Sequence, residues 1–397
     1  MELFYSNKTI RVVSRKEKAS LLVEILLGIN VLNYVLYGFL GLEHRKFVFL
    51  TFSLLLLSVS LWQVREEFSW LDFVVGIMLA IGILYYRFIS QVGYSSILFN
   101  LPFFVTGFSI AILFKYSYFS RWSFLIYATL AIAPFLYAFF ILKVNLEGQG
   151  FFFSMNRNTI PLLLITITAL QVMNDALNDR YIMVYPSALV VVCSYFSMSR
   201  AGLLLSLCLF SIVLLANGKN WLYKSEHRIF WVKEHKVIGL LLLIVVGIIV
   251  LVGIWVFLKD TRLALLGIKD SARVSIALEF FDQLTLRNFL IGFRPSLTGV
   301  TRLHNSFLTM LSYYGIFTFG LYFLIAISLL HYMKHSFVLF GVFGVWCLHS
   351  LVESISPLDF GDFLFIPLIM IALYQKGWEL FPDKKKPMEL VRSVLKK

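Results

Sequence analysis

The chain has 397 residues, of which 59% are hydrophobic and only 14% are charged, and its formal net charge is +13. Soluble domains carry about 25% charged residues, whereas the mean hydropathy here is +0.84, so the composition excludes an ordinary soluble enzyme. The aromatic content of 17% also excludes a disordered chain. We therefore predict an all-α polytopic membrane protein.

A bilayer core of ~30 Å requires ~20 apolar residues per helix, and this requirement predicts about twelve transmembrane helices. We expect them to form one integral membrane domain over residues 1–397. No signal peptide is expected, because residues 1–18 are polar and basic. The twelve apolar windows are 19–42, 47–63, 70–86, 95–114, 122–142, 160–174, 182–198, 201–216, 237–258, 305–330, 337–352 and 363–375.

Twelve spans place both termini on the same side of the membrane. Most of the 35 Lys and Arg residues fall on that side, including those of a basic tail over residues 376–397. Because basic residues gather on the cytoplasmic face, we predict that both termini are cytoplasmic. The aqueous segments contain no basic stripe with stacking aromatic residues, so nucleic acid is not an expected partner.

The longest aqueous segment, residues 259–303, then lies on the outer, periplasmic or extracellular side. Within it, apolar residues recur at helical spacing and predict an amphipathic helix over residues 272–286. No cytoplasmic segment is long enough to fold into a nucleotide-binding domain. Any substrate should therefore be membrane-borne or on the outer side. The residues of the predicted apolar stripe are Ala277, Phe280, Phe281 and Leu284.

Arginine residues gather on this predicted outer side. Guanidinium groups bind phosphate through two parallel hydrogen bonds, so converging arginines suit a pyrophosphate better than a sugar. The alternative is that each arginine contacts lipid headgroups at the membrane surface. The candidates are Arg200, which lies between two apolar runs, Arg157 in the first outer loop, and Arg273, Arg294 and Arg302 in the second.

His304 lies at the end of the long outer loop, directly before a predicted span. A neutral imidazole there can remove a proton from a sugar hydroxyl as a general base, and Asn305 can bind the sugar or orient the ring. The alternative is that His304, Asn305 and Ser306 only cap the following helix. Glu353 follows His349 by four residues, and Asp359 and Asp362 lie just beyond it. One of these acids can orient His304 or bind the acceptor sugar, and Glu353 is the candidate for the site. We predict no metal site, because metal requires three or four converging ligands.

Two acidic residues, Glu24 and Asp72, lie inside predicted spans without a basic partner nearby in the sequence. Charges at membrane depth are costly. We therefore expect each to be neutralised or bonded to another helix.

Several short motifs occur together in a fixed order: SerArgAlaGly (199–202), Arg273 before the amphipathic helix, IleGlyPhe (291–293), and HisAsnSerPheLeu (304–308) ahead of Gly315. In this order the chain resembles the O-antigen polymerase/ligase superfamily of bacterial envelope glycosyltransferases. The resemblance covers residues 150–330 by motif, and the rest by hydropathy and topology.

The resemblance implies a GT-C-like glycosyltransferase of the bacterial cytoplasmic membrane, with its active site facing outward. Such enzymes transfer a sugar chain from undecaprenyl pyrophosphate to an acceptor hydroxyl, with inversion and without metal or other cofactor. By position, Arg200, Arg273 and His304 would be catalytic, and Asn305, Arg157, Arg294, Arg302 and Glu353 would bind substrate. A chain-length regulator and a flippase are the implied protein partners.

Three functions stay open at this stage. We favour polymerisation of lipid-linked repeat units into an O-antigen or capsule. The alternatives are a ligase that moves the glycan to lipid A-core, and a lipid-linked oligosaccharide flippase. A flippase should carry charge deep within several helices, whereas the arginines here gather in the outer loops.

Overall fold

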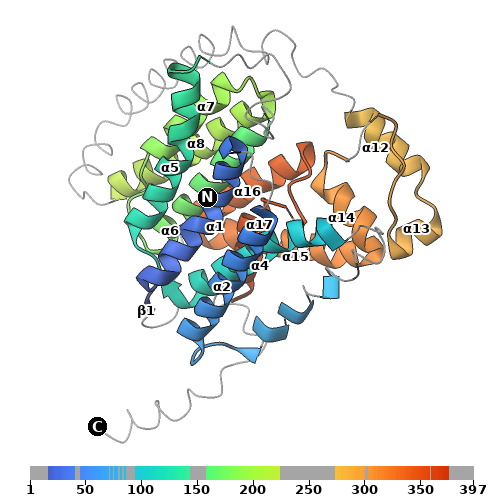
Figure 1. Ribbon diagram of the computed structural model, residues 1–397, viewed down its shortest axis with the longest axis horizontal. Coiled ribbons are helices and arrows are strands. Elements are labelled where there is room, and N and C mark those ends of the chain that lie inside the picture. Colours follow the sequence, from blue (N-terminus) through green and yellow to red (C-terminus); the bar gives the residue numbers. More distant parts are fainter. Residues whose placement is uncertain are drawn as a thin grey trace, which may run out of the picture.

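The structure is a computed structural model, and it describes residues 17–40, 45–70, 72–74, 76–78, 81–82, 85, 94–143, 158–223, 273–299, 303–357 and 359–374. Within these ranges the chain is almost entirely helical (Figure 1). The first helices are α1 (Leu21–Leu40), α2 (Arg45–Val64), α4 (Tyr94–Tyr116), α5 (Arg121–Phe140), α6 (Thr159–Leu177), α7 (Tyr185–Phe196) and α8 (Arg200–Tyr223). They are followed by α12 (Arg273–Asp282), α13 (Leu286–Ile291), α14 (Ser306–Tyr314), η1 (Gly315–Phe317), α15 (Thr318–His335), α16 (Phe337–Val352) and α17 (Asp362–Tyr374).

Five helical segments of the described residues are long and apolar enough to cross a membrane. They are Phe47–Val64, Arg121–Phe140, Thr159–Leu177, Arg200–Gly218 and Ser306–His335, and shorter apolar helices occur at Leu21–Asn33, Asn100–Tyr116, Tyr185–Phe196, Phe337–Val352 and Asp362–Leu373. The chain is therefore an all-α membrane protein. The predicted window 237–258 lies outside the described residues, and the window 70–86 is described only in part.

One end of the bundle, which we call the loop end, is defined by residues 17–20, 63–69, 115–121 and 174–182. Gln63 Nε2 donates to the Lys18 carbonyl at 3.3 Å and to Ser117 Oγ at 3.2 Å. Arg180 Nη1 donates to the Phe119 carbonyl at 3.1 Å. The two-residue parallel strands β1 (Glu17–Lys18) and β2 (Ser117–Tyr118) also pair here. Helices α2, α4 and α6 therefore all end at the loop end.

Contacts along the bundle give the direction of the later helices. Phe103 packs on Phe360 and Phe363, and one turn later Gly107 packs on the Asp362 backbone and on Ile366, so the contacts advance along both helices and α4 and α17 run in parallel toward the loop end. Trp346 of α16 stacks on Phe365 of α17 with ring centroids 4.6 Å apart. Because only a short turn joins α16 to α17, α16 runs the other way. Its last residues lie at the opposite end, which we call the site end.

Helix α8 begins at the site end, beside the start of α6. A side chain at Gly202 would place its Cβ only 2.4 Å from Pro161 Cβ, so the crossing of α6 and α8 requires a glycine here. Ser199 Oγ accepts a hydrogen bond from the Gly202 amide at 3.2 Å. The SerArgAlaGly motif thus begins α8 and places Arg200 at its first residue.

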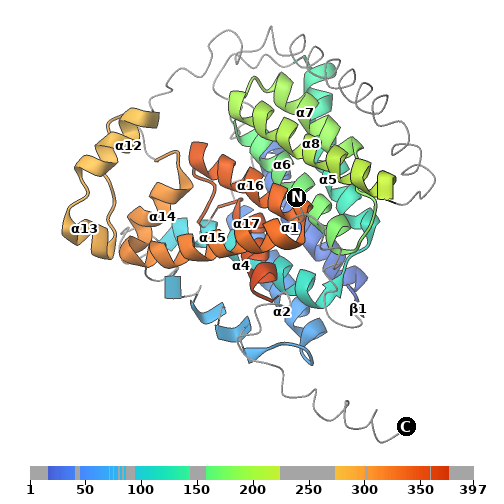
Figure 2. The same ribbon diagram turned by 180° about the vertical axis from the view of Figure 1, so that it is seen from behind.

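The predicted span 305–330 is one apolar segment but not one continuous helix. It breaks at Gly315, which has a positive φ of 52°, and a Cβ there would lie 2.5 Å from the Gly292 amide nitrogen. This close approach fixes α13 against the break. Helices α12 and α13 form an arm beside α14, on the side of the molecule away from α5 and α7 (Figures 1 and 2).

Candidate functional site

Glu353 joins two of the predicted catalytic residues. Its Oε1 accepts a hydrogen bond from Arg273 Nη2 at 2.6 Å, and its Oε2 lies 3.1 Å from His304 Nδ1. The three residues come from α12, from the turn before α14, and from the end of α16, and they are 31 to 80 positions apart in the sequence. Residues that the sequence predicted as separate candidates thus form one charged cluster.

Within the cluster the carboxylate is largely buried, whereas the two basic side chains are partly exposed to solvent. The Glu353 side chain is 16% exposed, whereas those of Arg273 and His304 are 32% and 40% exposed. Burial acts to raise the pKa of the Glu353 carboxyl, but the His304 hydrogen bond and the Arg273 charge outweigh it, so the pKa lies below its ordinary value. Glu353 is therefore ionised at neutral pH and can act only as an acceptor.

Because a carboxylate cannot donate, the shared proton belongs to His304 Nδ1. A neutral His304 is then the Nδ1–H tautomer, and its Nε2 carries the lone pair that can accept a proton. The His304 backbone has a positive φ of 50°, a conformation that costs about 1–3 kcal/mol outside glycine. Such a conformation persists only where surrounding contacts hold the backbone in it.

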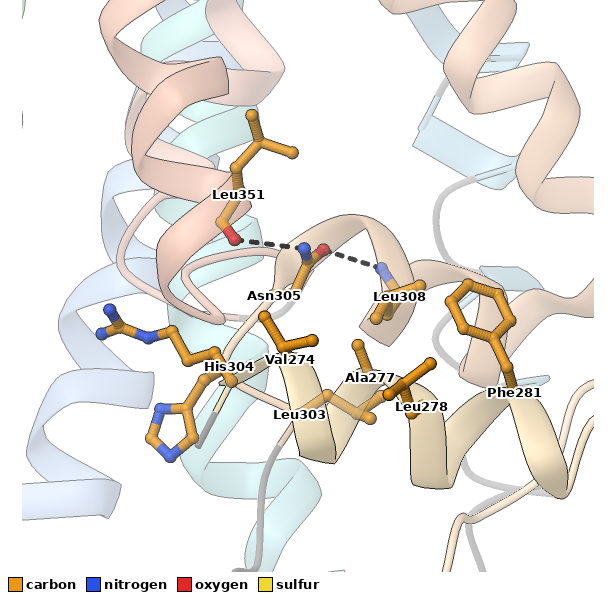
Figure 3. Close-up of a pocket in the computed structure, with 10 residues that line it drawn as sticks. Val274, Ala277, Leu278, Phe281, Leu303, His304, Asn305, Leu308 and Leu351 are labelled. Carbon is orange, nitrogen blue, oxygen red and sulfur yellow. Dashed lines mark hydrogen bonds between the residues drawn. The ribbon is translucent and has the colours of Figure 1, made fainter. Parts of the chain in front are cut away.

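Asn305 has a structural role in the described contacts. Its Oδ1 accepts a hydrogen bond from the Leu308 amide at 3.0 Å, so Asn305 is the N-cap of α14. Its Nδ2 donates to the Leu351 carbonyl at 3.1 Å (Figure 3). Of the two functions considered for the HisAsnSer trio, capping therefore describes Asn305, whereas His304 contributes to the charged cluster.

A cavity of about 290 Å³ opens beside the cluster. Arg273, His304 and Asn305 line it together with apolar side chains. Along α12 the apolar side chains continue away from His304 (Figure 3). A cavity of this kind can hold a molecule with an anionic group next to a long apolar chain. Its apolar lining residues are Val274, Ala277, Leu278, Phe281, Leu303, Leu308 and Leu351.

Arg200 lies at the same end of the bundle but on a different helix. Gly341 of α16 packs against Ile212 of α8, and these helices run in opposite directions. Arg200 and Glu353 are each twelve residues from that contact toward the site end, about 18 Å along the helix axis. The two residues are therefore at a similar height, although Arg200 is not among the described residues that line the cavity.

Of the three remaining arginine candidates only Arg294 is described, and no contact joins it to this cluster. Arg294 is exposed in the segment after α13. Arg157 and Arg302 lie outside the described residues. Glu353 contacts Arg273 and His304 directly, so orientation of His304 describes it better than binding of substrate.

The predicted amphipathic helix 272–286 differs from the structure in extent and in the faces it presents. It ends at Asp282, and a second helix begins after Thr285, whose side chain accepts from the Asn288 amide as an N-cap. Ile276 and Phe280 are buried, whereas Phe281, which we placed on the same stripe as Phe280, is half exposed in the cavity wall. Helix α12 thus has two apolar faces, one packed and one lining the cavity.

The sequence analysis did not identify the apolar residues that line the cavity, nor the residues that hydrogen-bond to the turn carrying Glu353. Val274 and Leu278 line the cavity, and Ser306 and Thr309 bond to the turn that carries Glu353. Exposed apolar residues on both faces of a short helix are the one signal that could have indicated the wall. Among the described residues, no group of three His, Cys, Asp or Glu side chains could hold a metal ion.

Comparison with known proteins adds no assignment: no family model matches the chain, and no curated protein matches it.

Proposed function

We propose that the protein is a membrane glycosyltransferase that polymerises polyprenyl-pyrophosphate-linked oligosaccharide repeat units into a surface polysaccharide. The observation that carries this proposal is the cluster in which Glu353 holds Arg273 and His304 beside a largely apolar cavity. A general base, an anion-binding cation and a site for a lipid chain are the three elements that this reaction requires.

The donor has an anionic diphosphate next to a long isoprenoid chain, and the cavity is lined by a cationic side chain and by apolar side chains. Arg273 would contact the diphosphate, while Val274, Leu278 and Phe281 would contact the chain. Arg200 would reach the diphosphate or a second lipid-linked substrate from α8. As the leaving group separates, negative charge grows on the diphosphate, and the arginines stabilise this charge most in the transition state.

The acceptor hydroxyl would be activated by His304. Nε2 removes the hydroxyl proton, the oxygen attacks the anomeric carbon from the face opposite the diphosphate, and the bond from that carbon to the diphosphate oxygen breaks. Polyprenyl pyrophosphate leaves with the bonding electron pair, and the new linkage has inverted configuration. Glu353 stabilises the imidazolium that forms.

For the architecture we propose about twelve spans in a GT-C-like arrangement, with the loop end in the cytoplasm and the site end facing outward. Exposed tryptophans at the loop end, namely Trp62, Trp70 and Trp122, support a membrane interface there. Both termini would then be cytoplasmic, in the inner membrane of a bacterium.

The test uses purified protein in nanodiscs with lipid-linked repeat units. The wild type should form a ladder of products of increasing length, and His304→Ala should lower the rate at least ~100-fold, since general bases contribute about that much. Arg65→Ala is the control, because Arg65 is exposed at the loop end, away from the cluster. A ladder that persists in His304→Ala contradicts the assignment. Transfer of one repeat to lipid A-core would instead indicate a ligase, and lipid movement without a new bond would indicate a flippase.

A further inference from the structure

Glu353 lies where the chain leaves regular structure, so its position needs support from outside its own helix. It is the C-cap of α16, with φ −142° and ψ 151°, and the chain then continues through a turn to α17. A residue at such a point is not held by its own helix on its C-terminal side. Contacts from another element must therefore hold the Glu353 backbone relative to His304.

Those contacts come from the first turn of α14. Ser306 Oγ donates to the Glu353 carbonyl at 3.0 Å, and it accepts from the amides of Ile355 at 2.8 Å and Ser356 at 3.2 Å. One hydroxyl thus bonds to three backbone groups of the turn. Thr309 adds a bond between its Oγ1 and Ser354 Oγ at 3.0 Å.

The bonds of Ser306 define what it can and cannot do. A serine hydroxyl has one donor and two acceptor positions, and all three are used here. The side chain is also fully buried. Ser306 therefore has no capacity left to act as a nucleophile or to bind substrate.

Ser306 is two residues from His304 in the chain, and it bonds to the backbone of Glu353. It therefore links the backbones of the base and of its carboxylate partner, beside the Asn305–Leu351 hydrogen bond one residue earlier and in addition to the His304–Glu353 contact itself. We propose that Ser306 is a positioning residue, which sets the His304–Glu353 hydrogen bond by holding the 353–356 turn. The kinetic part of this inference rests on the proposed function.

A double-mutant cycle tests the inference. Glu353→Gln should lower kcat by ~100-fold or more, and Ser306→Ala by ~10-fold, the size of effect expected from a buried hydrogen bond of 1–3 kcal/mol. If Ser306 acts through Glu353, the double variant should be no slower than Glu353→Gln and should have the same pH profile. A double variant slower by the product of the two single effects would overturn the inference.

Ser312→Ala is the matched control, because Ser312 is an equally buried serine of α14 whose hydroxyl donates to the Phe293 carbonyl instead. It should leave kcat and the pH profile unchanged, and a loss equal to that of Ser306→Ala would overturn the inference. Ser306→Cys keeps a weaker donor and acceptor. Its kcat should fall between those of wild type and Ser306→Ala, and it replaces Ser306→Ala in the cycle should that variant not fold.

A second readout needs no substrate. In protein labelled with ¹⁵N-histidine, His304 should show a protonated Nδ1 in the wild type and in Ser312→Ala. Ser306→Ala, or Ser306→Cys in its place, and Glu353→Gln should shift His304 toward the Nε2–H tautomer. An unchanged His304 signal in the Ser306 variant would overturn the inference even if polymerisation is observed. Conversely, a shifted signal in a protein without polymerase activity would remove the proposed function but keep the positioning role.

Discussion

At the scale of single residues, the candidate site depends on pairings across long sequence distances. Glu353 is 80 residues from Arg273 and 49 from His304, yet one carboxylate bonds to both. Residue chemistry alone could nominate His304 and Arg273, because an imidazole can act as a general base and a guanidinium can bind an anion, but it left capping and contact with lipid headgroups open as alternatives. It could not select Glu353 over Asp359 or Asp362, since the folding of α16 against α14 decides which acid meets the histidine.

Glu353 should make stability depend on pH in one direction. Its pKa is lowered in the folded state, so its contribution is present above its unfolded pKa of about 4.3 and is lost as the pH falls through the lower folded value. Arg273, His304 and His349 are the charged groups that affect it. The wild type should therefore unfold at a higher temperature than Glu353→Gln at about pH 7, and the difference should shrink only below about pH 4.

Tryptophan fluorescence in nanodiscs during heating measures this difference. A difference that already disappears near pH 6, or that persists unchanged at the lowest pH, would contradict the pairing of Glu353 with Arg273 and His304.

At the scale of elements, hydropathy predicted the helices well where one apolar window corresponds to one helix long enough to cross a bilayer. The windows 122–142 and 160–174 correspond closely to α5 and α6. Buried Glu24 and Asp72 are bonded to other elements, as expected: Glu24 Oε1 accepts from the Ser120 amide, and Asp72 pairs with Lys115 of α4. The break at Gly315 was not predicted, because it depends on contact with Gly292 rather than on local composition.

The two faces of α12 should respond differently to substitution. Leu278 is 60% exposed and lines the cavity, so Leu278→Asn should raise the KM for the lipid-linked donor about 10-fold, by removing part of an apolar contact worth 1.5–3 kcal/mol. Its effect on folding should be small. Leu286→Asn, on exposed α13 and outside the cavity lining, is the control and should leave the KM unchanged.

Phe280 on the packed face behaves oppositely: Phe280→Ala should destabilise the arm by about 3–5 kcal/mol, because Phe280 is fully buried. Steady-state kinetics and thermal unfolding together separate the two faces. An unchanged KM in Leu278→Asn would show that the donor chain does not lie along α12.

At the scale of the whole molecule, the proposed function requires the charged cluster at one end of the helical bundle and the basic, cytoplasmic loops at the other. Glu353, Ser306 and the start of α8 define the site end, whereas the hydrogen bonds of Gln63 and Arg180 define the loop end. Composition was sufficient to predict an all-α membrane protein. It could not predict how the helices are ordered around the cavity, since helix neighbours follow from side-chain packing such as that of Trp346 on Phe365.

The most direct measurement follows the extended glycan and the released polyprenyl pyrophosphate together. It uses vesicles that hold the protein in one orientation, with lipid-linked repeat units supplied to one face at a time. The proposed reaction should release one polyprenyl pyrophosphate for each new glycosidic bond, only at the face that exposes the site end, and none in His304→Ala. Release of the lipid without a new bond, bond formation at the face of the loop end, or transport of the intact lipid-linked unit across the membrane would contradict it.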